Sequence, residues 1–339
     1  MSEPAPPPPP EVVVTQMIFG KWVAMALSVA AKLRVADALA GGPKTVANLA
    51  AETGTHPPSL YRVLRALASV GVFAEDAHGR FRQTPLSEVL RSDVPGSMRA
   101  VADYCGADWS WRPWGRLLET VRTGKTAFDA VFGEQAFEYL ARHPDESAVF
   151  NDGMTGFSMQ ESPAVAAAYD FSPFGTVVDV GGGHGHLLCT ILSKYPGPRG
   201  VVFDAPHVAA GAAPRIAAAG LADRCRAESG DFFKTVPAGD AYVMKHIIHD
   251  WPDAEATTIL RNCRAAARPG AKVVLVEMVI PPGNDPSPGK LLDLEMLVIA
   301  SGKERTEREY ADLLAGAGWR LTRIVPTESP ASVIEGEAV

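Results

Sequence analysis

The feature that most constrains the fold is a short apolar run that leads straight into a cluster of glycines. Residues 176–180 (TVVDV) have the β-branched composition of a buried strand, residues 181–185 (GGGHG) follow at once, and the apolar stretch 187–192 (LLCTIL) has helical character. Glycine permits backbone conformations that are closed to other residues, so a ligand can lie against the main chain at the start of a helix. This order predicts the first unit of a nucleoside-binding α/β domain.

The chain after residue 171 continues to alternate between apolar β-branched runs and Ala-rich helical stretches. Further strands are predicted at residues 200–204, 225–229, 241–246 and 272–278, with a closing pair near 321–325 and 331–334. Helices are predicted between them at residues 207–219, 253–267 and 306–317. The alternation predicts an α/β, doubly wound, mostly parallel sheet.

The first half of the chain is mainly helical, with one small excursion into strands. Residues 45–52 and 59–68 each begin with a helix-capping residue type, and residues 71–75 and 80–84 form two short strands around the turn 76–79. This is the pattern of a winged helix. We therefore expect a Pro-rich disordered tail at residues 1–10, a helical winged-helix-like domain at 11–165 and a ligand-binding domain at 166–339.

Composition argues against a nucleic-acid partner. The formal net charge is −7, and Arg62 and Arg65 are the only basic residues on the helix that would read DNA. We therefore favour a packing or dimerisation role for the winged-helix module. The apolar segment 12–40 can supply that surface, although burial within its own domain explains the segment nearly as well.

The same apolar segment raises the question of a membrane. Charged residues interrupt it, and its longest uncharged piece, around residues 23–31, is shorter than the ~20 residues of a spanning helix. We find neither a secretory leader nor a Cys-x-x-Cys pair among the four scattered cysteines. The prediction is a cytoplasmic protein without a membrane segment.

Acidic residues stand in register with the glycine cluster. Gly181, Gly183 and Gly185 form Gly-x-Gly-x-Gly and not the Gly-x-Gly-x-x-Gly of dinucleotide folds, so NAD is disfavoured. Asp204 ends the second strand, where a carboxylate accepts hydrogen bonds from both ribose hydroxyls. Asp231 follows the third strand, where it can accept from an adenine amino group while Phe232 covers the ring. Taken alone, Asp231 is equally a turn residue.

The segment 244–251 (MKHIIHDW) places Lys245 and His249 near the carboxyl end of the fourth strand, where open sheets bind ligands. His249 is the predicted general base. A phenol of pKa about 10 is only about one part in a thousand ionised at pH 7, a deficit of roughly 4 kcal/mol that a positioned imidazole largely offsets. His246 is interpreted as a strand histidine satisfied by packing and hydrogen bonds. Asp250 is either a helix cap or a substrate contact.

A histidine base needs a partner on its other ring nitrogen. Glu277, after the fifth strand, and Glu304, in the segment 302–305 (GKER), are the candidates, because a carboxylate there holds the imidazole tautomer. Read by itself, Glu304 belongs equally well to a solvated charged loop.

With these motifs in view, the chain resembles the O-methyltransferases of small-molecule and natural-product biosynthesis, the family of plant caffeic acid and isoflavone methyltransferases and bacterial antibiotic-tailoring enzymes. The resemblance rests on VDVGGGHG (178–185), FDAP (203–206), GDFF (230–233), KHIIHDW (245–251) and GKERT (302–306), all in the family's order. It spans nearly the whole chain. His184 departs from the pattern, because the family usually has a small hydroxyl residue there, and this departure bears on the methionine or ribose contacts.

The resemblance implies a Rossmann-like methyltransferase domain behind a helical, winged-helix-like dimerisation domain, and therefore a homodimer. It implies S-adenosylmethionine as cofactor, held by the glycine loop, Asp204, Asp231, Phe232 and Lys245, with S-adenosylhomocysteine as product. It implies that His249, flanked by Glu277 and Glu304, deprotonates the acceptor hydroxyl without a metal, and the sequence shows no clustered metal-ligand set. The segments that line family substrate pockets add candidate contacts, each of which a core-packing role explains as well: Trp109, Phe150, Met154 and Met296.

Two alternatives remain at this point. A family member can keep the fold and cofactor and yet catalyse hydroxylation or decarboxylation of a polyketide, although the presence of His249, Glu277 and Glu304 favours methyl transfer. A ligand-sensing regulator that uses the winged helix to bind DNA is disfavoured by the acidic charge.

Overall fold

The computed structural model describes residues 8–339, which form two compact units that divide between Trp111 and Arg112. This division lies ahead of the boundary expected at residue 165 from the change in composition. The expected tail at residues 1–10 falls largely outside the described residues, and the first helix already begins at Pro10. Each unit is described by itself below.

The first unit contains the helices and the hairpin of the predicted winged helix. Its strands β1 (Lys44–Thr45), β3 (Arg80–Gln83) and β2 (Phe73–Glu75) form one antiparallel sheet in that order. Its helices are α1 (Pro10–Lys32), α2 (Val35–Ala38), α3 (Val46–Thr53), α4 (Pro57–Ser69), α5 (Pro85–Glu88) and α6 (Arg99–Cys105), and α7 (Asp108–Trp114) crosses the division. Leucines of α4 pack against Phe73 and Phe81 of the hairpin in one buried cluster.

Helix α1 leaves most of its apolar side chains exposed. The predicted apolar segment 12–40 is not one helix, because Arg34 adopts a left-handed conformation (φ 55°) that separates α1 from α2. Met17, Ile18 and Trp22 are 73%, 59% and 58% exposed. By length and composition alone α1 could cross a membrane, with a mean hydropathy of 1.6 over its apolar window, but the core helix of a soluble protein meets the same test. An unburied apolar helix of this kind needs a partner surface.

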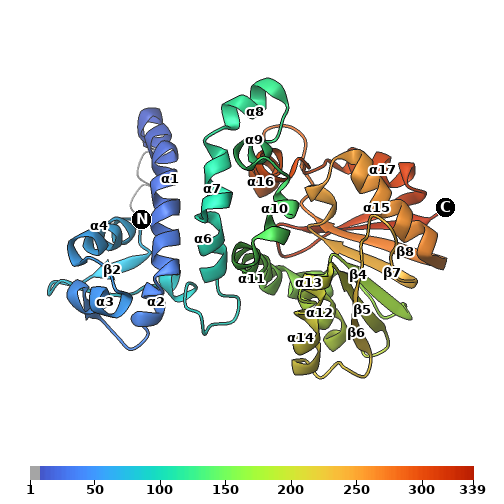
Figure 1. Ribbon diagram of the computed structural model, residues 1–339, viewed down its shortest axis with the longest axis horizontal. Coiled ribbons are helices and arrows are strands. Elements are labelled where there is room, and N and C mark those ends of the chain that lie inside the picture. The colour runs from blue at the N-terminus through green and yellow to red at the C-terminus, as the bar shows by residue number, and fades with distance from the viewer. Residues whose placement is uncertain (1–7) are drawn as a thin grey trace, which may run out of the picture. The chain divides into compact units, whose positions relative to one another are not determined.

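The second unit is a seven-stranded sheet with helices on both faces (Figure 1). The strand order is β6-β5-β4-β7-β8-β10-β9, and β10 alone runs in the direction opposite to the other six strands. The strands are β4 (Thr176–Val180), β5 (Arg199–Asp204), β6 (Cys225–Ser229), β7 (Gly239–Lys245), β8 (Ala267–Glu277), β9 (Trp319–Pro326) and β10 (Ser332–Ala338). The predicted doubly wound, mostly parallel sheet is confirmed.

The helices of this unit also follow the predicted order. They are α8 (Leu117–Thr123), α9 (Ala127–Phe132), α10 (Ala136–Arg142), α11 (Pro144–Ala168), α12 (His186–Lys194), α13 (Pro206–Ala209), α14 (Ala212–Ala218), α15 (Asp253–Ala266), α16 (Pro288–Glu295) and α17 (Glu307–Gly316), with a 3-10 turn η1 (Ile248–Asp250) and a π-helical turn η2 (Met296–Ala300). The helix predicted at 207–219 is two helices, α13 and α14, separated near Gly211.

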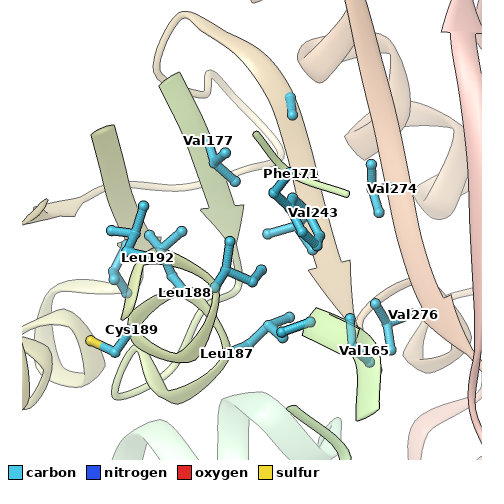
Figure 2. Packing of buried hydrophobic residues seen from close by; sticks show 14 of the residues in the cluster. Val165, Phe171, Val177, Leu187, Leu188, Cys189, Leu192, Val243, Val274 and Val276 are labelled. Atoms are coloured by element: carbon cyan, nitrogen blue, oxygen red, sulfur yellow. The ribbon is translucent and has the colours of Figure 1, made fainter. Parts of the chain in front are cut away.

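The long helix α11 is anchored on the sheet through its C-terminal half. Figure 2 shows Val165 of α11 in the same buried cluster as Leu187 of α12 and the sheet valines Val243 and Val276. All four residues are at most 3% exposed. Because α11 is held there, its neighbouring turns lie over the carboxyl ends of the strands, where the site described next is built.

Candidate active site

The glycine loop takes the backbone conformation that its sequence predicts. Gly181, Gly183 and Gly185 have φ angles of 69°, 56° and 76°, a region that L side chains rarely adopt. A Cβ at Gly181 would lie 2.5 Å from Ile247, whereas a Cβ at Gly183 would meet no described atom within 4 Å. A Cβ at Gly185 would lie 2.9 Å from Val202, so the loop is tightly packed at both ends and open at Gly183.

Carboxylates follow the strands on both sides of this loop. The Asp204 side chain, at the end of β5, accepts hydrogen bonds from the backbone N–H of Gly183 (2.8 Å) and of Ala205 (2.7 Å). The Asp231 side chain, just after β6, accepts from the N–H of Phe233 at 2.9 Å and is 43% exposed. The parallel strands thus bring the glycines, Asp204 and Asp231 to one edge of the sheet, as the sequence predicts.

His249 lies in η1, directly after the fourth parallel strand. Its Nδ1 is 2.6 Å from Oε1 of Glu304 and 3.7 Å from Oε2 of Glu277. The imidazole and both carboxylates are buried. Both predicted carboxylate partners therefore reach the same nitrogen, although they are 27 residues apart in the chain. With Nδ1 engaged, Nε2 is the nitrogen left to exchange a proton with a ligand.

The charges around His249 determine its proton affinity. Burial lowers the pKa of His249, but the negative charges of Glu277 and Asp250 and the hydrogen bond to Glu304 outweigh burial and raise that pKa to about 10. Burial raises the pKa of Asp250 to about 6, against the opposing effect of His249. The Asp250 Oδ1 lies 3.5 Å from Nε2 of His249, so this carboxyl stands beside the proton-accepting atom.

Asp250 is not a helix cap, because α15 begins at Asp253 and its N-cap residue is Pro252. Of the two roles that the sequence left open, the structure removes the capping role.

The loop that carries His249 contacts the segment that contains Gly302 and Arg305. A Cβ at Gly302 would lie 1.9 Å from the carbonyl oxygen of His249, and the next residue, Lys303, donates its N–H to that oxygen at 2.9 Å. The fully buried Arg305 guanidinium donates to the carbonyl oxygens of Ile248 (3.0 Å) and Trp251 (2.9 Å). Sequence reasoning quoted GKER as a motif but assigned no role to this glycine and arginine.

A second histidine and a third glutamate lie beside the base, and sequence reasoning missed the glutamate. His246 follows β7 with a left-handed φ of 53°, so it ends the strand and does not belong to it, which corrects the interpretation as a strand histidine. Its Nε2 lies 2.9 Å from Oε2 of Glu161 on α11, and Lys245 Nζ is 3.6 Å from the same oxygen. Glu161 is separated from Lys245 and His246 by more than eighty positions, and no local sequence pattern predicts that it lies beside them.

Known proteins identify the scaffold. The model of an O-methyltransferase domain matches residues 114–320, and that of an O-methyltransferase dimerisation domain matches residues 15–93. The chain belongs to the O-methyltransferase family. The two matches also fall on either side of the division between Trp111 and Arg112.

Individual relatives of this O-methyltransferase cover almost its full length. It is 48% identical to phenazine O-methyltransferase PhzM of Lysobacter antibioticus over 96% of both chains. It is 37% identical to 8-amino-8-demethylriboflavin N,N-dimethyltransferase of Streptomyces davaonensis, over 92% of this chain and 91% of the relative. The solved structure of NcsB1 from neocarzinostatin biosynthesis, in complex with S-adenosylmethionine and 2-hydroxy-5-methyl naphthoic acid, matches with a TM-score of 0.81 and 36% identity, covering 93% of this chain and 96% of that one.

Aromatic side chains of the O-methyltransferase gather around Trp251, which sequence reasoning also missed. Phe137 of α10 stacks on Trp251 with ring centroids 5.4 Å apart, and Phe233 meets it edge-on at 4.7 Å. Phe150 of α11, a predicted substrate contact, packs edge-on against Phe137 at 6.1 Å. Phe232, predicted to cover adenine, lies 6.1 Å from Trp251. These rings form one aromatic cluster next to the loop of the proposed base.

The other predicted substrate contacts are dispersed. Met154 is half-buried on α11, and Met296 is buried at the start of η2. Trp109 belongs to the first compact unit, where it is 1% exposed and packs against Tyr104 at 5.4 Å between ring centroids. The substrate roles of these residues therefore stay predictions.

A potential metal-ligand cluster exists in space although none is visible in the sequence. His246, His249 and Glu277 each offer one possible ligand atom, and these three atoms lie within 4.8 Å of one another. His249 Nδ1 is already hydrogen-bonded to Glu304, and His246 Nε2 to Glu161. Two of the ring nitrogens that could bind an ion therefore already have carboxylate partners.

Proposed function

We propose that this O-methyltransferase transfers a methyl group from S-adenosylmethionine to a phenolic hydroxyl of a small aromatic molecule, with His249 as general base. The observation that carries the proposal is the buried 2.6 Å contact between His249 Nδ1 and Glu304, because it occupies Nδ1 and leaves Nε2 to accept a proton. The name of the phenazine relative and the naphthoic acid bound to NcsB1 support an aromatic acceptor.

The cofactor fits the residues at the sheet edge. Gly183 leaves open space beside the backbone, and Asp204 presents a carboxylate that two backbone N–H groups hold in place for ribose hydroxyls. We assign Gly181, Gly183, Gly185, Asp204, Asp231, Phe232 and Lys245 to binding S-adenosylmethionine. When bound, this cofactor supplies an electrophilic methyl group on a sulfonium.

The protein's own part in the reaction is the movement of one proton. His249 Nε2 accepts the proton of the acceptor hydroxyl, whose oxygen would take the methyl group as the carbon–sulfur bond breaks and S-adenosylhomocysteine is left. Glu304 and Glu277 stabilise the imidazolium that results, because both carboxylates lie within 3.7 Å of Nδ1. Proton removal offsets most of the roughly 4 kcal/mol that ionising a phenol costs at neutral pH.

We further propose that the protein is a homodimer in the cytoplasm and needs no metal. The match of residues 15–93 to a dimerisation domain and the exposed apolar residues of α1 support the dimer. All four cysteines, which lie in the described part of the chain, are free thiols, as expected in a reducing compartment.

The test is a methyl-transfer assay with the full chain, S-adenosylmethionine labelled in its methyl group, and a chelator present throughout. Matched acceptors that differ only in one atom, such as a hydroxynaphthoate and the corresponding aminonaphthoate, are followed by mass spectrometry together with S-adenosylhomocysteine. Labelled methyl on the hydroxyl compound supports the proposal. Preference for the amine, which the riboflavin relative makes a real alternative, would overturn the choice of acceptor. Activity that appears only when metal is added in excess of the chelator would overturn metal independence.

A further inference from the structure

A buried ion-pair candidate, Glu161 with His246, lies beside the proposed base and has no part in the chemistry described so far. Nε2 of His246 lies 2.9 and 3.2 Å from the two oxygens of Glu161, and Lys245 Nζ is 3.6 Å from one of them. The side chains of Glu161, Lys245 and His246 are only 7%, 10% and 12% exposed. Burying these charged groups is unfavourable unless they are paired, so we asked what the pairing contributes to the site.

The fold holds Glu161 in place through its own helix. Glu161 and Val165 are four residues apart on α11 and therefore share one face of the helix. Val165 is fully buried in the cluster of Figure 2, against the inner side chains of the sheet. Anchoring of Val165 thus directs Glu161 towards the carboxyl end of β7.

The backbone of His246 is held in an uncommon conformation. A φ of 53° is uncommon for residues other than glycine, although histidine adopts it more often than most, and such conformations persist where the surroundings enforce them. The His246 N–H donates to the carbonyl oxygen of Val276 on β8 at 3.1 Å. The ring then lies between two carboxylates, with Nε2 at Glu161 and Nδ1 3.6 Å from Oε2 of Glu277.

Glu277 is the link to the base. Its Oε1 accepts from the N–H groups of Ile247 (3.3 Å) and Ile248 (3.0 Å), which fixes the loop that carries His249. Its Oε2 has no hydrogen-bond partner among the described residues and lies between Nδ1 of His246 and Nδ1 of His249, at 3.6 and 3.7 Å. A fully buried carboxylate in this position needs a positive charge close by.

We propose that Glu161 and a protonated His246 are positioning residues, which supply a positive charge that remains beside Glu277 when His249 is neutral and hold the Glu277 carboxylate behind the base. The kinetic part of this inference rests on the function proposed above, whereas the ion pair itself does not. The pKa directions agree. Burial raises the pKa of Glu161, but its contacts with His246 and Lys245 lower it overall. Burial and Lys245 lower the pKa of His246, but Glu161 and Glu277 raise it overall.

The charged groups that face His246 come from four elements. They are Lys245 at the end of β7, Glu161 on α11, Glu277 at the end of β8, and His249 with Asp250 in η1. The rings of His246 and His249 stack with centroids 5.0 Å apart. A cation on His246 therefore makes it easier for His249 to lose its proton. Removing that cation makes His249 hold its proton more firmly.

The first measurement uses the unmodified enzyme. NMR of protein labelled with ¹⁵N-histidine reports the protonation of each ring, and the His246→Asn spectrum assigns the His246 signals. We expect both nitrogens of His246 to be protonated at pH 7. A neutral His246 ring at pH 7 overturns the proposal, whatever the enzyme methylates.

The second measurement is a double-mutant cycle with Glu161→Gln and His246→Asn, in which asparagine is chosen because it tolerates the left-handed backbone. Each single variant is expected to lower kcat and to move the acid limb of the kcat/KM profile to higher pH by about one unit, because each removes the cation beside His249. The double variant is expected to show no further shift. Asp152→Asn, an exposed charge loss on the same helix, is the matched control and is expected to leave the profile unchanged.

The outcomes separate the two proposals. Loss of activity with an unmoved pH profile, or additive effects of the two substitutions, means that Glu161 and His246 are merely structural and overturns the positioning role. Circular dichroism and S-adenosylhomocysteine binding show whether each variant is folded, and the NMR measurement on the unmodified enzyme stands if one is not. A protonated His246 in an enzyme that methylates no phenol overturns the acceptor and leaves the ion pair intact.

Discussion

His249 shows how one residue can be tuned by its neighbours against its burial. Three carboxylates raise its pKa to about 10, so the imidazole of the free enzyme carries a proton at pH 7. A high pKa makes the neutral imidazole a strong proton acceptor. The proton that His249 carries in the free enzyme has to leave before His249 can act as a base. A cationic ligand close to His249 lowers the pKa of His249 and so favours loss of that proton.

Replacing His249 by alanine tests the base directly. We expect His249→Ala to bind S-adenosylhomocysteine as the unmodified enzyme does and to methylate a phenol roughly 10²- to 10⁴-fold more slowly. His78→Ala, which removes an exposed histidine from the first unit, is the control and retains full activity. Turnover by His249→Ala equal to that of the control would defeat the general-base assignment.

Proton release on cofactor binding tests the charge state of His249. Because its pKa lies near 10 in the free enzyme and falls when a sulfonium binds nearby, we expect a proton to be released when S-adenosylmethionine binds at pH 8. S-adenosylhomocysteine lacks the positive sulfur and is expected to release fewer protons. Calorimetry in buffers of different ionisation enthalpy counts the protons, and an unchanged count in His249→Ala contradicts the assignment.

At the scale of elements, the base depends on how closely the segment after η2 approaches η1. The two segments are more than fifty residues apart in the chain, and their backbones meet at Gly302, where no side chain fits. Arg305 then ties the carbonyl oxygens of the η1 loop to the start of α15, because its guanidinium also donates to Asp253 at 2.8 Å. Glu304 lies between Gly302 and Arg305 in the sequence, so the contacts of both residues determine where its carboxylate lies.

Adding a methyl group at Gly302 tests this approach. Gly302→Ala would place its Cβ 1.9 Å from the His249 carbonyl oxygen, so the loop has to move. We expect the free energy of unfolding to fall by about 1–3 kcal/mol, as for other overpacked sites, and kcat to fall with it. Gly316→Ala, where a Cβ meets no described atom within 4 Å, is the matched control. Equal stability and activity in the two variants would show that the close approach does not hold the base.

At the scale of the whole molecule, α1 exposes an apolar surface that a single chain does not cover. The length and composition of α1 are also compatible with a membrane-spanning helix, so they do not distinguish a protein partner from a membrane. The match of residues 15–93 to a dimerisation domain favours a second copy of the chain. Ile18 and Trp22 are four residues apart and share one exposed face of the helix.

A charge on that face is expected to separate the dimer. Ile18→Glu buries an unpaired carboxylate in the interface, so light scattering after gel filtration is expected to show a dimer for the unmodified chain and a shift towards monomer for the variant. Leu118→Glu, at an exposed leucine of α8, is the control and leaves the dimer unchanged. A monomeric unmodified chain, or one that sediments with lipid vesicles, would contradict the role assigned to α1.

The sequence by itself determined what local physics controls. The strand–glycine–helix unit, the alternation of strands and helices along the chain, and the positions of Asp204 and His249 after strand ends follow from periodicity and from backbone freedom, both of which adjacent residues determine. The roles of Glu161, Gly302, Arg305 and Trp251 did not follow, because each depends on a partner 50 or more residues away or on a backbone approach that has no local signature. His246 was misread because a left-handed backbone ended its strand one residue early, and only the tertiary structure placed its ring between two carboxylates.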